Sequence, residues 1–107
     1  MTTATQLDMD YLKLLRKTWN NPQYSAPISF LQRMMALVET TEGPILECGS
    51  GLTTIVLAKV CDRPIVVLEH DKAWIDTLLA FWDNAQPVNV DIRHCKIKRY
   101  PHEAGEQ

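Results

Sequence analysis

The feature that most constrains this chain is a glycine turn between a short apolar run and a helical segment. The apolar run covers residues 44–48, and the turn reads Glu47-Cys48-Gly49-Ser50-Gly51-Leu52-Thr53-Thr54. Glycines at such a junction let the chain turn tightly, and they let a ligand approach the backbone because no Cβ atom stands in the way. The N-terminus of the following helix adds free N–H groups and a favourable dipole. We therefore expect a strand, a tight turn and a helix in this order.

A second apolar run, at residues 64–68, ends at Glu69, twenty positions after Gly49. Its β-branched residues are continuous, which is typical of a strand covered on both faces. An acidic side chain at this distance from the turn is suited to accept hydrogen bonds from both hydroxyls of a ribose. Because ligands of open α/β sheets bind at the carboxyl ends of the strands, the turn and Glu69 would share one site. The pattern favours a nucleoside-containing ligand, with a purely structural turn as the alternative.

The remaining segments complete an α/β pattern. Apolar residues recur at helical spacing over about 7–19, 30–38, 53–60 and 74–82. Asp71 can cap the last of these helices. Alternating apolar residues from Val88 to Ile92 predict a third strand. The apolar residues fall on even positions through Ile92 and on odd positions from Cys95, so one face cannot stay buried throughout, and the strand bulges near His94 or ends there. The order α-α-β-α-β-α-β predicts parallel strands with right-handed crossovers.

Composition places the chain among ordinary globular domains. It has 107 residues, 46% of them hydrophobic, and a net charge of -2, so we expect one domain over residues 1–107. No apolar run is long enough to span a bilayer, and we expect no membrane partner. The three cysteines are odd in number and have no C-x-x-C spacing, which argues against disulfides and zinc and favours a cytoplasmic location. Cys48 is expected to be a small buried hydrophobe.

Two other clusters are weaker candidates. The C-terminal part is rich in basic side chains, namely Arg93, His94, Lys96, Lys98, Arg99 and His102. Such a run can contact phosphates or RNA, but it is more often a solvated strand and tail, so we expect no nucleic-acid partner. His94, Cys95 and His102 lack a fourth ligand and a standard spacing, so no metal site is predicted. The three tryptophans fall on apolar helix faces and are expected in the core.

The glycine turn also carries a resemblance to a known family. Residues 46–54, followed by Val67-Leu68-Glu69-His70-Asp71, resemble motif I and the acidic second-strand motif of class I S-adenosylmethionine-dependent methyltransferases. They are closest to the bacterial subset written LE-x-GSG-x-ST and VEHD. Ile92-Arg93-His94-Cys95 is similar to the region after the third strand in that subset. The resemblance implies half of a Rossmann-like unit, with a helical segment at 1–43 and a βαβαβ half at 44–100 in strand order 3-2-1.

The resemblance implies a site for S-adenosylmethionine built from seven residues: Glu47, Gly49, Ser50, Gly51, Glu69, His70 and His94. Glu47 would lie near the amino group of the methionine moiety. The two glycines would let the backbone pass the ribose and the carboxypropyl group. Glu69 would hold the ribose hydroxyls, His70 would flank the adenine, and the segment around His94 would approach the adenine edge. Methyl transfer asks mainly for positioning, so little covalent chemistry is required of the protein.

The family sheet runs 3-2-1-4-5-7-6, and this sequence supplies strands 1, 2 and 3. The family's remaining half holds the substrate pocket and any general base, so no catalytic residue is predicted here. Strand 1 would have a bare edge, which is a template for association, and we expect a homodimer or larger assembly that covers it. Two functions remain open: a cofactor-binding methyltransferase-like protein that a partner chain completes, or a non-catalytic remnant or interaction module.

Overall fold

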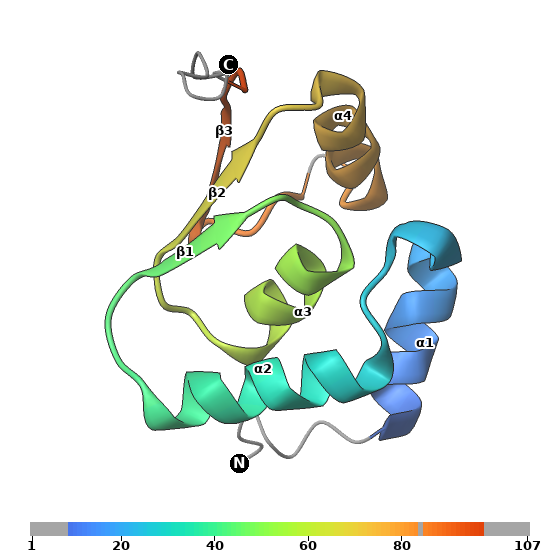
Figure 1. Ribbon diagram of the computed structural model, residues 1–107, viewed down its shortest axis with the longest axis vertical. Helices are drawn as coiled ribbons and strands as arrows, with labels where there is room; N and C mark the ends of the chain where they lie inside the picture. Colours follow the sequence, from blue (N-terminus) through green and yellow to red (C-terminus); the bar gives the residue numbers. More distant parts are fainter. Residues whose placement is uncertain (1–8, 84, 98–107) are drawn as a thin grey trace, which may run out of the picture.

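Three parallel strands form one open sheet in the order β1-β2-β3 (Figure 1). This confirms the parallel pairing predicted from the sequence and the strand order that the resemblance implied. The computed structural model describes residues 9–83 and 85–97. The strands are β1 (Ile45–Cys48), β2 (Ile65–Glu69) and β3 (Val90–His94). The helices are α1 (Met9–Trp19), α2 (Ile28–Thr40), α3 (Leu52–Val60) and α4 (Lys72–Phe81), with a 3-10 turn, η2 (Pro22–Tyr24), in a segment predicted as a loop. The α/β fold class is therefore confirmed, as a half Rossmann-like unit.

Local sequence explains where the elements begin and end. The Asp71 carboxylate accepts a hydrogen bond from the backbone N–H of Trp74 at 3.1 Å, so Asp71 caps α4 as predicted. The shift in apolar phase after Ile92 coincides with the end of β3 at His94, which confirms that the strand stops there. The expected start of the first helix near residue 7 lies outside the described residues.

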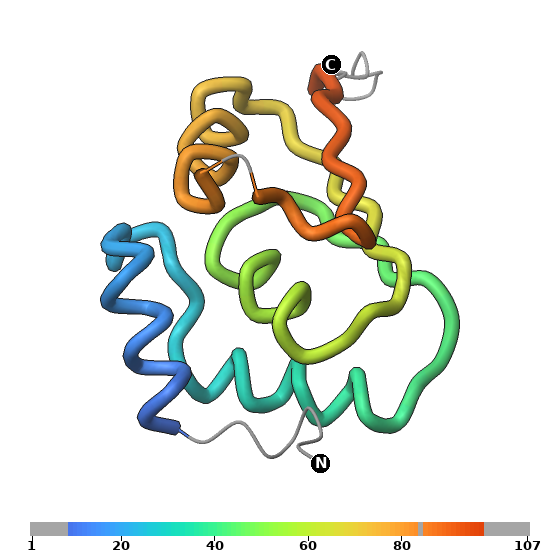
Figure 2. The backbone as a smooth tube through the Cα atoms, turned by 180° about the vertical axis from the view of Figure 1, so that it is seen from behind, coloured from blue at the N-terminus to red at the C-terminus, as the bar shows by residue number. Residues whose placement is uncertain are grey.

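The helices lie on one side of the sheet, and the two opposite views agree on this (Figures 1 and 2). On the covered face, Ile45, Ile65 and Val90 stand side by side in one row of the register. Leu57 of α3 packs there with Ile65, Val67 and Val90. A second cluster joins the helices to one another around Leu12, Leu15, Trp19, Leu31, Met35, Leu52, Ile55, Val56 and Leu78. Arranged in this way, the helices build a core beneath one face of the sheet.

The other face of the sheet is not covered by any described residue, and two predictions fail there. The apolar run of β2 predicted cover on both faces, but burial alternates: Ile65 and Val67 are buried, whereas Val66 and Leu68 are only half-buried. Cys48, predicted to be buried, is exposed. The reason is common to both: these side chains alternate with the covered ones and point away from the helices.

Arg63 joins the helical layer to the strand layer. Its guanidinium donates to the carbonyl oxygens of Val38 (3.1 Å), Thr41 (3.3 Å) and Gly43 (2.7 Å). These carbonyls lie at the end of α2 and in the loop that enters β1.

Among the described helices, none is both long enough and apolar enough to cross a membrane.

Candidate functional site

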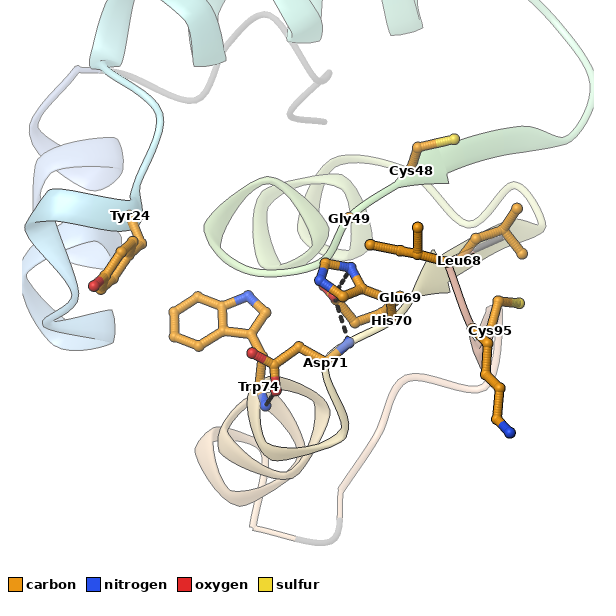
Figure 3. A pocket seen from close by; sticks show the side chains of 11 residues that line it. Tyr24, Cys48, Gly49, Leu68, Glu69, His70, Asp71, Trp74 and Cys95 are labelled. Carbon is orange, nitrogen blue, oxygen red and sulfur yellow. Dashed lines mark hydrogen bonds and ion pairs between the residues drawn. The ribbon is translucent and has the colours of Figure 1, made fainter. Parts of the chain in front are cut away.

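A cleft of about 820 Å³ opens at the carboxyl ends of the three strands (Figure 3). Its lining comes from the last residues of β1 and β2 (Cys48, Leu68 and Glu69), from the residues that follow β1, β2 and β3, from the first turn of α4 and from Tyr24 on η2. This volume falls within the usual range for small-molecule sites, and the position is the one that open α/β sheets use for ligands. The predicted location of the site is therefore a cleft in the structure.

The glycine turn forms one wall of the cleft. Gly49 has φ +94°, and a Cβ atom built there would meet nothing within 4 Å, so its backbone is open to the cleft. Gly51 has φ +142°, and a Cβ atom there would lie 3.4 Å from the indole ring of Trp74. Both conformations favour glycine, because side-chain-bearing residues rarely adopt them. Gly49 thus contributes open backbone, whereas Gly51 permits the close approach of Trp74.

Glu69 is buried at the end of β2, and its carboxylate holds the turn in place. Oε1 accepts hydrogen bonds from both the backbone N–H and the hydroxyl of Ser50, each at 2.8 Å. Oε2 accepts one from the backbone N–H of Asp71 at 3.0 Å, and Nδ1 of His70 lies 3.4 Å away. Desolvation by itself would raise the pKa of Glu69, but these hydrogen bonds outweigh it and hold the pKa below its ordinary value. Glu69 is therefore an ionised carboxylate at neutral pH.

Glu47 lies on a different side of the turn. Its carboxylate accepts hydrogen bonds from the hydroxyls of Thr53 and Thr54, the latter at 2.6 Å. Thr54 in turn accepts from the backbone N–H of Gly51 at 3.1 Å. Burial raises the pKa of Glu47, against the lowering effect of the two threonine hydroxyls. Glu47 lines a separate apolar groove of about 390 Å³ between α2 and β1, so the structure does not place it in the cleft with Glu69.

An aromatic side chain, Trp74, forms a further part of the cleft wall directly beside the glycine turn, and sequence reasoning missed it. Nε1 of Trp74 donates a hydrogen bond to the carbonyl oxygen of Ser50 at 2.6 Å. The Trp74 ring meets Tyr24 edge-on at 5.9 Å and Trp19 edge-on at 5.3 Å. Trp19 is a core residue as predicted, but Trp74 is half-buried and lines the cleft. Its position three residues after the Asp71 cap was the available signal, since the first turn of a helix lies beside the preceding strand end.

The two histidines lie at the rim. His70 is exposed and lines the cleft. Nε2 of His94 lies 3.1 Å from the carbonyl oxygen of His70, to which it donates when it carries the proton. His94 itself does not line the cleft, whereas its neighbour Cys95 does.

The predicted residues are thus sorted by position. Gly49, Glu69 and His70 meet in the cleft, Ser50 and Gly51 shape it, His94 supports its rim, and Glu47 faces away. Among residues 9–83 and 85–97, no cluster of three or more metal-ligating side chains occurs. Three residues of the basic run, Lys98, Arg99 and His102, lie outside the described residues.

An ionised carboxylate, open backbone and an aromatic wall suit a ligand that offers hydroxyl groups and a flat ring. No protein-family model, curated protein or solved structure was found to match this chain.

Proposed function

We propose that the cleft binds S-adenosylmethionine or S-adenosylhomocysteine, as the likeness of the glycine turn to a methyltransferase motif implies. The proposal rests on the surroundings of Glu69. Its ionised carboxylate lies at the end of β2, beside an open glycine turn and in a cleft of suitable volume. Ligand hydroxyls bind such a carboxylate through charge-assisted hydrogen bonds, which are stronger than neutral ones.

The contacts of Glu69 set a condition on this binding. A carboxylate has about four acceptor positions; the N–H and hydroxyl of Ser50 and the N–H of Asp71 use three of them, and His70 lies beside Oε2. A ribose brings two hydroxyls, so in this proposal one of them displaces the Ser50 hydroxyl from Oε1 and the other takes the position beside His70 on Oε2. In this proposal the Ser50 hydroxyl donates to Glu69 in the free protein and gives up this hydrogen bond when the ligand binds.

Catalysis is a separate matter. Methyl transfer requires an acceptor held in line with the sulfonium carbon and protected from water. We propose that this chain supplies the cofactor half of such a site and that a partner chain completes it.

A calorimetric titration with S-adenosylhomocysteine tests the proposal. Wild type should bind saturably, and Glu69→Ala should lose about 1.5–3 kcal/mol, or roughly ten- to a hundredfold in affinity. Ser50→Ala is the matched control, because it removes the hydroxyl that holds Glu69 but leaves the carboxylate for the ligand. It should retain affinity within a few fold. Absence of binding to folded wild type would overturn the proposal, and equal losses in both variants would show that Glu69 acts only by holding the turn.

A second candidate function rests on a different observation, the free edge of β1. This strand pairs with β2 on one side and with no other described strand, and Leu46 in it is 64% exposed. Phe30 and Leu37 of α2, also exposed, line the adjoining groove. We propose self-association as a homodimer or larger assembly, with the chain acting as an interaction module and not as a catalyst. Light scattering across a concentration series tests this, and a monomer throughout would contradict it.

A further inference from the structure

The face of the sheet that points away from the helices carries an ordered pattern of side chains. Two rows follow from the strand register: Leu46, Val66 and Asp91 in one, and Cys48, Leu68 and Arg93 in the other. In each row the residues on β1 and β2 are therefore uncharged, and the residue on β3 is charged. We call this set of six residues the open face.

A parallel sheet with one face in water is unusual, because such sheets are normally covered on both sides. The apolar part of the open face is substantial, since Leu46 is 64% exposed and Val66 and Leu68 are only half-buried. All helices of the described chain lie on the other side (Figures 1 and 2). Two members of the open face, Cys48 and Leu68, also line the cleft (Figure 3). The remaining apolar side chains, Leu46 and Val66, extend this apolar area along the sheet, so the open face has the composition of a surface that is buried against something else.

The two charged residues on β3 are compatible with burial of the open face. Arg93 donates to Oδ2 of Asp91 through Nε at 3.0 Å and through its terminal nitrogen at 2.9 Å. Both side chains are more than half exposed, at 60% and 54%. The pair adds no net charge to the face, so the face can be buried without leaving an uncompensated ion, which would be costly.

We propose that the open face is the docking surface for the same face of a second copy of this chain. A two-fold axis that lies between two stacked sheets and runs across the strands places β1 over β1 and β3 over β3, in opposite directions. This rotation exchanges the two rows. Asp91 of each copy then faces Arg93 of the other, and Val66 faces Leu68. The face is thus complementary to itself in both charge and apolarity.

The size of the face sets the strength of the contact. Three strands about 4.8 Å apart, with a rise of about 3.3 Å per residue, give a face roughly 15 Å on each side. This area is well below the roughly 800 Å² that each partner buries in a standard interface. The dimer is therefore weak and concentration-dependent, and the paired charges contribute much of its specificity.

This inference rests on the proposed self-association but assigns it to a different surface: the open face, where the proposal above named the edge of β1. The two surfaces are separable because Asp91 and Arg93 lie on β3, two strands away from that edge. Charge changes on β3 therefore weaken a face-to-face dimer and leave an edge-to-edge dimer intact.

Sedimentation equilibrium of the full chain with charge-reversed variants tests the inference. Asp91→Arg places like charges opposite each other at both symmetric contacts, and so does Arg93→Asp. Each variant alone should raise the dimer dissociation constant by about a hundredfold. Mixing the two variants should restore the dimer, because each contact between the chains then joins opposite charges again.

The control is Lys72→Glu, which reverses a charge in the exposed Lys72–Asp76 ion pair on α4, among the helices. It should leave the dissociation constant unchanged, and circular dichroism should show that all variants are folded. A dimer that resists both β3 variants would overturn the face-to-face arrangement while keeping self-association, and the mixture failing to recover would do the same. A monomeric wild type would overturn both.

Discussion

Replacing Glu69 by glutamine tests the central contact of the cleft without ligand. The glutamine side chain keeps the shape but loses the charge, and one of its two ends becomes an NH₂ group. That end faces either Ser50 or Asp71, both of which donate to Glu69 in the structure. One donor is therefore left without an acceptor, and the remaining hydrogen bonds lose their charge-assisted strength. We expect the free energy of unfolding at pH 7 to fall by about 2 kcal/mol, or roughly 10 °C in Tm.

The pH dependence of this loss gives a second readout. The pKa of Glu69 is lower in the folded protein than its ordinary value of 4.5. Its contribution to stability is therefore present above about pH 4.5 and is lost as the pH falls through the folded-state pKa. The difference between wild type and Glu69→Gln should accordingly shrink in acid.

Urea denaturation followed by circular dichroism at several pH values measures both effects. Glu42→Gln is the matched control, since it removes the same charge from an exposed position and should change stability little. The reasoning is refuted if Glu69→Gln loses less than about 0.5 kcal/mol at pH 7, or if its loss is undiminished in acid.

The other predictions concern the glycine turn. Glu47→Gln should act in the opposite sense, because burial raises the pKa of Glu47: its favourable contribution is complete below about pH 4.5 and declines as the pH rises through the folded-state pKa. The variant should therefore be more stable than wild type at pH 7, and the same denaturation series should show this gain vanishing in acid. Gly51→Ala should cost about 1–3 kcal/mol in backbone strain, plus its contact with Trp74. Gly49→Ala, with free space around its Cβ position, should cost less, and a reversed order of the two midpoints would contradict this geometry.

Local patterns in the sequence predicted the elements well, because their causes are local. The Asp71 cap and the end of β3 at His94 follow from nearest neighbours, and both are confirmed. Cover on both faces of β2 was wrong for a different reason. An apolar run reports what a strand is suited to contact, but the contacting layer must come from elsewhere, and no described residue supplies it on that face.

The cleft was predictable in place but only partly in composition. Its position follows from the rule that ligands bind at strand ends, and Gly49 and Glu69 meet there. The contact between Trp74 and Ser50 joins residues 24 positions apart through two turns, which no periodicity encodes. The position of Tyr24 was even harder to predict, because this residue reaches the cleft only through the packing of the N-terminal helices.

The aromatic wall gives the cleft a built-in optical signal. The Trp74 indole lies at the cleft with its N–H on the Ser50 carbonyl, and Trp19 and Tyr24 flank it edge-on. A ligand entering beside this ring alters its solvation, so intrinsic fluorescence should respond to occupancy without any label. Trp19 contacts Trp74 but is buried, and Trp82 is half-buried, packs against both core clusters and does not line the cleft, so both provide a steady background against which the change at Trp74 can be read.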